Sequence, residues 1–243
     1  MIYEWKPKND TRNFGDALHE ILVPKKQHYE WTFDEEKMHF IVGSVISNTV
    51  MAETISQGYK PIFHGCGWRG EELDPELVEQ CEFHGVRGPY TQEELARHGI
   101  DTEISLDPAY QLPHIVAPGE PNGLAIAVKH VLDPTEHTPN TIHELKADAL
   151  FKPTVENRDD IVDFIKKISG ARFVLAGAMH AAIVADAYGV PFALMKSEYI
   201  DCPPKWADWL ASVGYGSPVF VKNTMEGREW YNTVKSESKK EEH

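Results

Sequence analysis

A segment in the second half of the chain, VLAGAMHAAIVADAYG, combines residue types that bind anions and transfer protons. An apolar run turns there through Gly177 into a stretch of small residues that predicts a helix beginning near Met179 and His180. The start of a helix offers backbone N–H groups and the positive end of the helix dipole, which attract phosphate or carboxylate. His180 can add a hydrogen bond or a positive charge, or it can simply bond to the backbone. We interpret the segment as an anion site in which His180 takes part.

A second group of polar residues lies near the N-terminus, in the sequence NFGDAL. Asp16 could act as a general base toward a hydroxyl group, with Asn13 and Gly15 beside it. Alternatively, Asp16 caps the helix that follows by accepting hydrogen bonds from backbone N–H groups. From the sequence alone, capping is the stronger expectation for Asp16.

Four further turns carry candidate binding residues. Arg87 stands between an apolar run and a Gly-Pro pair, where its planar guanidinium could hold a carboxylate or phosphate through two bonds. A salt bridge within the domain is an equally good interpretation of Arg87. Gly43 and Ser44 follow another apolar run. His64 and Lys129 are weaker candidates, because a histidine or lysine at a strand end is often only a solvated flank.

The elements that must position these residues alternate along the chain. Short apolar runs, each ending in a turn with glycine or polar residues, occur at 39–47, 60–68, 81–88 and 123–131. The segment ISLDPA, at 104–109, is expected to supply a further short strand and turn. Between them, helical periodicity is predicted from Pro89 to Gly99 and from Asn157 to Gly170. This alternation is typical of an α/β fold with parallel sheets and flanking helices. Because ligands of such sheets bind beyond the carboxyl ends of the strands, the turns are where we expect chemistry.

The stretch from Tyr110 to Asn122 holds three prolines and one glycine without helical periodicity. We place a domain boundary there, which gives an N-terminal domain at 1–115 and a C-terminal domain at 116–234. The last predicted helix, around 225–234, is expected to pack back on the first domain. Residues 235–243 are expected to form a disordered tail of mixed charge.

Composition excludes several classes of function. The chain has 24 Lys and Arg against 38 Asp and Glu, and its formal net charge of −14 opposes nucleic-acid binding over the general surface. No apolar run approaches the roughly 18 residues that a membrane span needs, and the N-terminus has no signal-peptide core. The three cysteines, Cys66, Cys81 and Cys202, are too scattered for a disulfide framework. We therefore expect a cytoplasmic protein.

Common catalytic and metal-binding motifs are absent. The sequence has no HExxH, no Walker loop, no GxSxG and no spaced Cys/His cluster. These absences disfavour a metalloprotease, a P-loop enzyme or a structural zinc site, and we expect no metal to take part.

Several motifs occur in an order that resembles the polysaccharide pyruvyltransferase family. They are NFGDAL, the turn at Gly43 and Ser44, GVRGPYTQEEL, SLDPAY and AMHAAIVADAYGVPFAL. The resemblance spans about residues 10 to 213 and is greatest with the short branch of succinoglycan-type ketal pyruvyltransferases, which also carry a segment like Lys205-Trp-Ala-Asp-Trp209. The family usually has an arginine two residues before the histidine of its second domain. This chain has Ala178 there, as the short branch does, so that arginine's phosphate-binding role is not carried over.

The resemblance implies two Rossmann-like domains in a GT-B-like arrangement, with the active site in the cleft. It implies phosphoenolpyruvate as donor, a saccharide or lipid-linked oligosaccharide as acceptor, no cofactor and no required metal. A lipid-linked acceptor would bring the protein close to a membrane surface. The acceptor would gain a cyclic pyruvate ketal after attack by two of its hydroxyl groups.

The resemblance also suggests which residues act. Asp16 and His180 are the expected catalytic acid–base pair. The expected substrate-binding residues are Asn13, Gly15, Gly43, Ser44, Arg87, Lys129 and Met179. Aromatic residues that could form an acceptor platform, although aromatics more often lie in the core, are Trp68, Tyr90, Trp206 and Trp209.

Two rival interpretations stay open at the level of sequence. A GT-B glycosyltransferase that uses a nucleotide sugar could hold a diphosphate at the same strand-to-helix turn. A non-catalytic homologue could act as a scaffold in polysaccharide assembly, because Ala178 replaces a ligand-binding arginine.

Overall fold

The computed structural model describes residues 1–5, 11–27 and 36–241, with side chains described up to residue 236. The chain divides into two compact units whose segments interleave along the sequence. Unit 1 comprises 1–5, 18–108 and 202–216, and unit 2 comprises 6–17, 109–201 and 217–243. The change of unit at Pro108 lies close to the boundary expected from the sequence. The sequence analysis did not predict that segments of the two units alternate along the chain.

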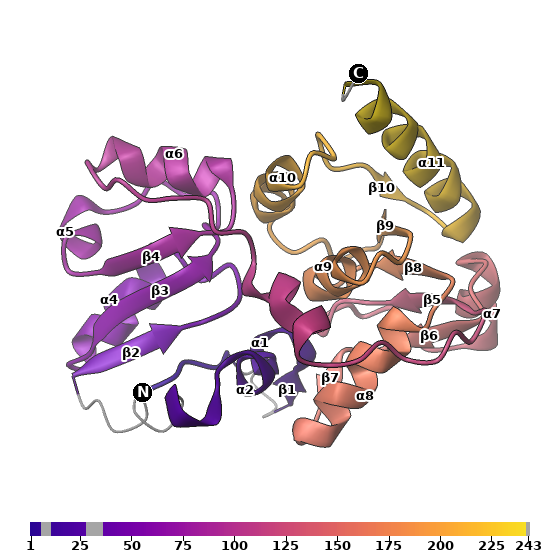
Figure 1. Ribbon diagram of the computed structural model, residues 1–243, viewed down its shortest axis with the longest axis horizontal. Coiled ribbons are helices and arrows are strands. Elements are labelled where there is room, and N and C mark those ends of the chain that lie inside the picture. The colour runs from indigo at the N-terminus through magenta and orange to yellow at the C-terminus, as the bar shows by residue number, and fades with distance from the viewer. Residues whose placement is uncertain (6–10, 28–35, 242–243) are drawn as a thin grey trace. The chain divides into compact units, whose positions relative to one another are not determined.

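Unit 1 is built on a three-stranded parallel sheet with the order β2-β3-β4 (Figure 1). The strands are β2 (Lys37–Phe40), β3 (Lys60–Cys66) and β4 (Glu82–Val86). The helices of this unit are α2 (His19–Leu22), α4 (Asn48–Ser56), α5 (Pro75–Val78), α6 (Pro89–Arg97) and α10 (Pro203–Ser212). Helix α4 packs against β3, and α6 packs against β4 and α10. The apolar core between sheet and helices includes Phe40, Phe63 and Leu95.

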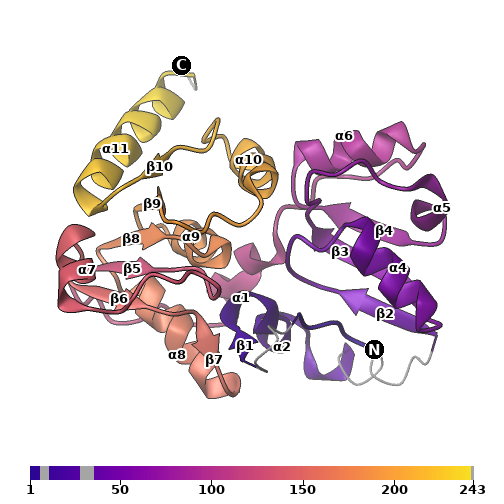
Figure 2. The ribbon, with the colours of Figure 1, turned by 180° about the vertical axis from the view of Figure 1, so that it is seen from behind.

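Unit 2 contains a five-stranded sheet with the order β10-β9-β8-β5-β6, in which every pair is parallel (Figure 2). Its strands are β5 (Ala125–Val128), β6 (Ala149–Phe151), β8 (Phe173–Ala176), β9 (Phe192–Met195) and β10 (Phe220–Val221). A separate antiparallel pair joins β1 (Arg12–Asn13) to β7 (Thr154–Val155). The parallel strands β5, β8 and β9 are buried along their whole length, which explains why they read as continuous apolar runs.

The helices of unit 2 cover both faces of its sheet. They are α1 (Phe14–Ala17), α7 (Pro139–Glu144), α8 (Arg158–Ser169), α9 (Met179–Ala187) and α11 (Thr224–Glu241), and a 3-10 helix, η1 (Pro108–His114), begins at the unit boundary. Phe173 and Leu175 of β8 pack with Trp230 of α11. Because successive side chains of a strand point to opposite faces, Val174 and Ala176 face the other side of the sheet.

Local sequence signals explain where α8 begins and ends. Asn157 accepts hydrogen bonds from the backbone N–H groups of Asp159 and Asp160, and the carboxylate of Asp160 accepts from the N–H of Asn157. This capping box satisfies backbone donors that a helix start otherwise leaves without partners. Gly170 ends the helix, so the predicted limits of 157 and 170 are confirmed.

Four expectations differ from the structure. The run at 39–47 forms a strand only to Phe40, and the expected strand in ISLDPA is a single bridge between Ile104 and Val86. The last helix, α11, was expected to pack back on the first domain, but it packs in unit 2. The segment of the second half that belongs to unit 1 is 202–216. Helix α11 is described to Glu241, over part of the segment expected to be a tail.

Within the described ranges, no helix is both long and apolar enough to cross a bilayer. The mixed α/β fold with parallel sheets and flanking helices is confirmed. The cytoplasmic location stays a prediction.

Candidate functional site

The carboxyl ends of β5 and β8 in unit 2 approach each other at Gly177. Its N–H donates to the carbonyl of Val128 at 2.7 Å. A Cβ at this position would lie 2.7 Å from Met195 Cε and 3.3 Å from both the backbone nitrogen of His130 and Cα of Lys129. Glycine therefore allows the turn before α9 to pack closely against the turn after β5.

His180 and Gly15 are brought together from two separate chain segments of unit 2. A Cβ on Gly15 would lie 2.3 Å from Nδ1 of His180, so the imidazole packs directly on the glycine backbone. Phe14 anchors α1 beside this contact, because it is fully buried and its ring lies 4.6 Å from that of Phe164. His180 is 8% exposed, and Met179 is also buried in the first turn of α9. The structure thus joins two motifs that the sequence places 165 positions apart.

Asn13 and Asp16 belong to the same local group. The side-chain amide of Asn13 donates to a carboxylate oxygen of Asp16 at 2.5 Å. The amide fixes the carboxylate near the start of α1. Asn13 itself is held by the short strand pair of β1 with β7, where it lies opposite Thr154.

Lys129 lies directly after β5 and is buried. Its ammonium donates to the backbone carbonyls of Asp133 and Thr135, so the side chain curls over its own turn. The N–H of Thr135 donates in turn to Oδ1 of Asp133 at 2.8 Å. The positive charge therefore stays at the carboxyl end of β5, next to the turn that leads to His180.

The remaining expected binding residues, Gly43, Ser44 and Arg87, lie together in unit 1. Gly43 has a φ of 108°, a conformation that favours glycine, and its carbonyl accepts from the N–H of Gly67. The Arg87 side chain is fully buried and donates to the hydroxyl of Ser44 at 2.7 Å. A Cβ on Gly67 would lie 2.0 Å from Nη2 of Arg87, so this glycine makes room for the guanidinium.

Asp208 of α10 is the anionic partner of Arg87 and was missed in the sequence analysis. The two side chains are fully buried and approach to 3.5 Å. Asp208 also accepts from the backbone N–H of Thr91 at 2.9 Å and from its hydroxyl at 2.8 Å. It thereby caps α6, whose own preceding residue, Gly88, has no side chain to do so. The only sequence signal for Asp208 was its place in the segment from Lys205 to Trp209.

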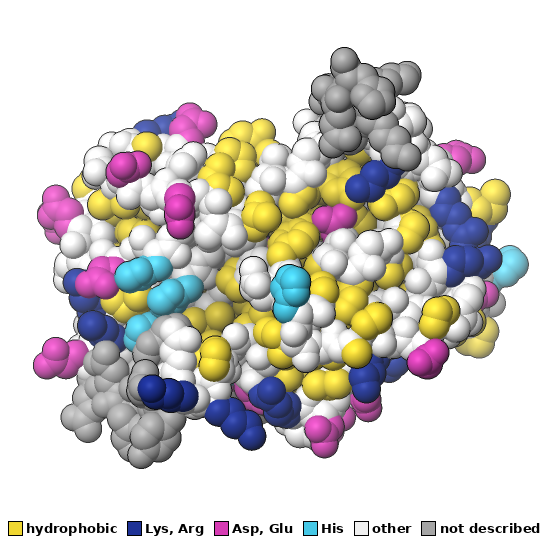
Figure 3. Space-filling model, viewed as in Figure 1, with side chains coloured by type: hydrophobic (Ala, Val, Ile, Leu, Met, Phe, Trp, Pro, Cys, Tyr) yellow, Lys and Arg dark blue, Asp and Glu magenta, His cyan; other side chains and the backbone are white. Residues whose placement is uncertain are grey.

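His64 does not lie at a strand end. It sits within β3 in a row of stacked histidine rings, with His39 at 5.4 Å and His84 at 5.1 Å between ring centroids. Nδ1 of His39 lies 3.1 Å from Nε2 of His64. Figure 3 shows histidine side chains gathered over this sheet. Burial, followed by the charges of His39 and His84, lowers the pKa of His64 to about 4, so the ring is neutral at physiological pH.

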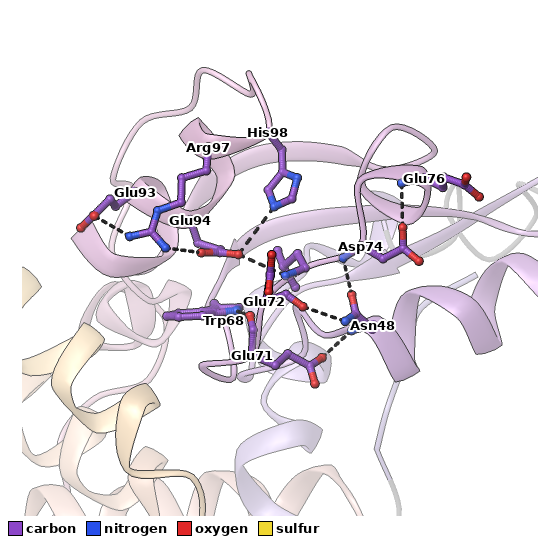
Figure 4. Close-up of polar contacts among 11 residues, drawn as sticks. Asn48, Trp68, Glu71, Glu72, Asp74, Glu76, Glu93, Glu94, Arg97 and His98 are labelled. Carbon is purple, nitrogen blue, oxygen red and sulfur yellow. Dashed lines mark hydrogen bonds and ion pairs between the residues drawn. The ribbon is translucent and has the colours of Figure 1, made fainter.

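A second polar network of unit 1 lies near the surface (Figure 4). Glu94 of α6 accepts from the backbone N–H of Leu73 at 3.1 Å and pairs with Arg97 at 3.1 Å. Asn48 accepts from the N–H of Asp74 at 2.8 Å, which ties the start of α4 to α5. These contacts connect loops to helices and include none of the expected site residues.

Three acid and histidine side chains of unit 1, Glu4, His19 and Glu20, group together although the sequence showed no metal-binding motif. Their ligand atoms all lie within 4.8 Å of one another, a set that could hold a cation. The sequence does not reveal this set, because Glu4 lies far from the other two residues along the chain. The expectation that no metal takes part stays a prediction.

The aromatic candidates divide between core and surface. Trp206 and Trp209 are buried in α10, so they stabilise unit 1 and do not offer an exposed platform. Trp68 donates from Nε1 to the carbonyl of Glu71, and Tyr90 is 45% exposed.

The letters GxGxxG occur at residues 65–70, beginning in the last two residues of β3. The next helix, α5, begins only at Pro75, so the third glycine does not open a helix as the dinucleotide fingerprint requires. Beside α6, a surface groove of about 500 Å³ is lined by Gln92, Glu93 and Thr102 among others, and none of the expected site residues lines it.

Comparison with known proteins adds two findings. A family model described as polysaccharide pyruvyl transferase matches residues 7–199. The chain is also similar to the succinoglycan biosynthesis protein ExoV of Rhizobium meliloti (strain 1021), with 27% identity over 221 residues. The matched region covers 87% of this chain and 64% of that protein, so the chain spans less than two thirds of the length of its relative.

Proposed function

Because this chain belongs to the polysaccharide pyruvyl transferase family, we propose that it is a transferase that moves the pyruvyl group of phosphoenolpyruvate onto a saccharide and forms a pyruvate ketal. The observation that carries the proposal is the family match over residues 7–199. The name of the relative, which refers to succinoglycan biosynthesis, supports a role in making an exopolysaccharide. We further propose that the two units are Rossmann-like domains of the GT-B-like type.

The donor would bind at the start of α9 in unit 2. The helix dipole and the first-turn N–H groups attract the phosphate or carboxylate of phosphoenolpyruvate, with Met179 and His180 in that turn. Ala178 supplies no charge there. Lys129, which is held at the adjoining turn by carbonyl groups, would supply the positive charge that Ala178 lacks. Gly15 serves this site by allowing the His180 ring to pack against the backbone.

Asp16 and His180 would handle the protons of the reaction. The methylene carbon of phosphoenolpyruvate takes one proton, and the first acceptor hydroxyl attacks C2 and loses its proton. Phosphate then leaves with the electrons of its C–O bond, and the second hydroxyl adds to C2 and loses its proton. Of the two protons released, one replaces that taken up by the methylene carbon and one leaves on phosphate. We assign the base role to Asp16 and the acid or phosphate-ligand role to His180.

Arg87, Gly43 and Ser44 form a separate part of the proposal. Their contact with the donor would require the guanidinium or the Ser44 hydroxyl to exchange a protein partner for the ligand. A Ser44→Ala variant tests this part by itself, because a tenfold weaker affinity for phosphoenolpyruvate is expected only if the turn touches the donor.

Calorimetry of the full chain tests the donor. We expect phosphoenolpyruvate to bind and to raise the melting temperature, since a ligand that binds only the native state stabilises it. No shift with millimolar phosphoenolpyruvate would contradict the proposal. Binding of a nucleotide sugar instead would favour a glycosyltransferase.

Release of phosphate from phosphoenolpyruvate with a panel of saccharides tests the reaction. We expect His180→Gln and Asp16→Asn each to reduce release by about 10²-fold or more, the usual contribution of a positioned acid or base. His137→Gln, which changes an exposed histidine of the same unit, is the matched control. Donor binding without release by the wild type would favour a non-catalytic role.

A further inference from the structure

The surface groove beside α6 in unit 1 lies outside the group assigned to the donor. Its volume is about 500 Å³. One wall comes from α6, where the lining positions 89, 92, 93 and 96 share one face because residues three and four apart are neighbours on a helix. The other wall is the segment 99–102, which follows the helix. All of these residues belong to unit 1, so the groove is complete within it.

Gln92 connects the two walls of the groove. Its side-chain nitrogen donates to the backbone carbonyl of Thr102 at 2.7 Å. This bond fixes the plane of the amide, so the side-chain oxygen of Gln92 is also held in a defined position. That oxygen can only accept hydrogen bonds. The groove therefore contains a positioned acceptor.

The charged side chains that line the groove are both acidic. Glu93 accepts from Nη2 of Arg97 at 2.8 Å, so a cation of the same helix balances its charge (Figure 4). Asp101 is exposed, and no hydrogen bond or ion pair joins its carboxylate to another described residue. Asp101 is thus the charge of this groove that a ligand could balance.

Thr102 adds a buried polar atom to the same wall as Asp101. Its hydroxyl oxygen is buried and has no hydrogen-bond partner among the residues that the structure describes. Buried hydroxyl groups in native proteins usually have a partner. A donor group seated in the groove would supply one, so this atom also favours a ligand rich in N–H groups.

These groups suit a cation on an aliphatic stem. A lysine ammonium has three N–H donors and an arginine guanidinium has five, which match the carboxylates and the amide oxygen of the groove. Pro89, Ala96 and Ile100 supply apolar lining along which the methylene groups of such a side chain can lie. A phosphate would be repelled by Asp101, and an uncharged saccharide would gain nothing from its charge.

We propose that this groove is a docking site for a partner polypeptide, which inserts a lysine or arginine side chain of a basic segment. Asp101 and the Gln92 oxygen hold the cationic head, and the apolar lining holds the stem. The groove is larger than one such side chain, so it also admits the residues on either side of it. None of the residues assigned to the reaction takes part, so the inference does not depend on the proposed function.

NMR titration of the full chain with the peptide acetyl-Ala-Arg-Ala-amide tests the docking site. We expect the side-chain amide signals of Gln92 and the backbone amide signals of 99–102 to move. Asp101→Lys should weaken the affinity about tenfold, because it removes an attractive charge and adds a repulsive one. Glu53→Lys is the matched control, since it changes the net charge equally at an exposed position of α4 outside the groove.

The control ligand is the same peptide with glutamine in place of arginine, which should not bind. Added salt should weaken binding of the arginine peptide, because it screens exposed charges. Melting temperatures of the variants show whether a lost affinity reflects unfolding.

Two results would overturn the docking site. Equal losses of affinity in Asp101→Lys and Glu53→Lys would show that only the general negative charge attracts the peptide. Equal binding of the glutamine peptide, or no movement of the groove signals, would remove the role of the cation. If methyl β-D-glucopyranoside moves these signals and the arginine peptide does not, the groove binds a saccharide instead. Calorimetry with phosphoenolpyruvate tests the donor separately, so neither result decides the other.

Discussion

Arg87 in unit 1 lies in a glycine-containing turn between a strand and a helix, and His180 in unit 2 lies just after such a turn, in the first turn of α9. In the structure the two side chains have different surroundings. Arg87 is fully buried, and its guanidinium donates to Ser44 and pairs with Asp208. His180 packs on the backbone of Gly15, and Lys129, whose ammonium donates to two backbone carbonyls, lies at the adjoining turn.

The difference shows that the same local pattern can place a side chain in two different environments. A buried arginine with an aspartate partner joins β4, α6 and α10 into one unit. A histidine at the start of a helix, packed against a glycine, keeps its ring in a defined position at the end of a parallel sheet, where ligands of such folds bind. The following predictions test this contrast, from the largest effect to the smallest.

Asp208→Ala should cause the largest loss of stability. The variant leaves the Arg87 charge buried without its anionic partner and removes the acceptor for two donors of Thr91. Breaking a buried ion pair in this way costs about 3–5 kcal/mol. Urea unfolding measures the change, and a loss as small as that of an exposed ion pair would show that Arg87 does not hold unit 1 together.

Gly15→Ala should displace His180. The new Cβ would lie 2.3 Å from Nδ1 of the ring, so ring or backbone must shift, at a cost of about 1–3 kcal/mol. We also expect weaker binding of phosphoenolpyruvate in calorimetry. Gly123→Ala is the matched control in unit 2: its φ of 70° makes alanine unfavourable, yet no atom lies within 4 Å of the new Cβ. If Gly15→Ala and the wild type bind phosphoenolpyruvate with equal affinity, His180 is not part of the donor site.

His64 should make unit 1 sensitive to acid. Its folded-state pKa of about 4 lies below the ordinary value of 6.5, so the unfolded chain binds more protons between these values. This contribution to stability is fully present above pH 6.5 and is lost as the pH falls toward 4. Among the described residues, titratable groups beside the ring include His39 and His84, and Glu82 lies beyond His84.

Unfolding curves of the wild type and His64→Phe between pH 7 and pH 4 check this prediction. The variant keeps an aromatic ring in the stack and should lose less stability on acidification. Parallel curves would mean that other groups govern the acid response. Unfolding curves of His180→Gln, a histidine substitution in unit 2, serve as the comparison.

Glu93→Ala should have the smallest effect. A hydrogen bond from Arg97 to Glu93 and the charge of Glu93 raise the pKa of Arg97, but both side chains are 63% exposed. Water and salt screen such a pair, so we expect no measurable change in the urea midpoint. A clear loss of stability would contradict the expected difference between this exposed pair and the buried pair of Arg87 and Asp208.

Local sequence physics was sufficient for much of the fold. The limits of α8 followed from Asn157 and Gly170, and those of α6 from Pro89 and Gly99, because caps, proline and glycine act within one helical turn. The buried strands β5 and β8 were visible as continuous apolar runs. The strand expected in ISLDPA failed because pairing with a neighbour, and not local propensity, decides whether such a short segment extends beyond one bridge.

The sequence by itself determined the α/β alternation, the family and the turns in which polar residues would gather, since these depend on neighbouring residues and on motif order. Only the tertiary structure decided which of those residues meet. Arg87 and Asp208 are 121 positions apart, and no local pattern pairs them. The contact of Gly15 with His180 arises in the same way, because chain segments distant in sequence become neighbours only when the sheet and its helices pack.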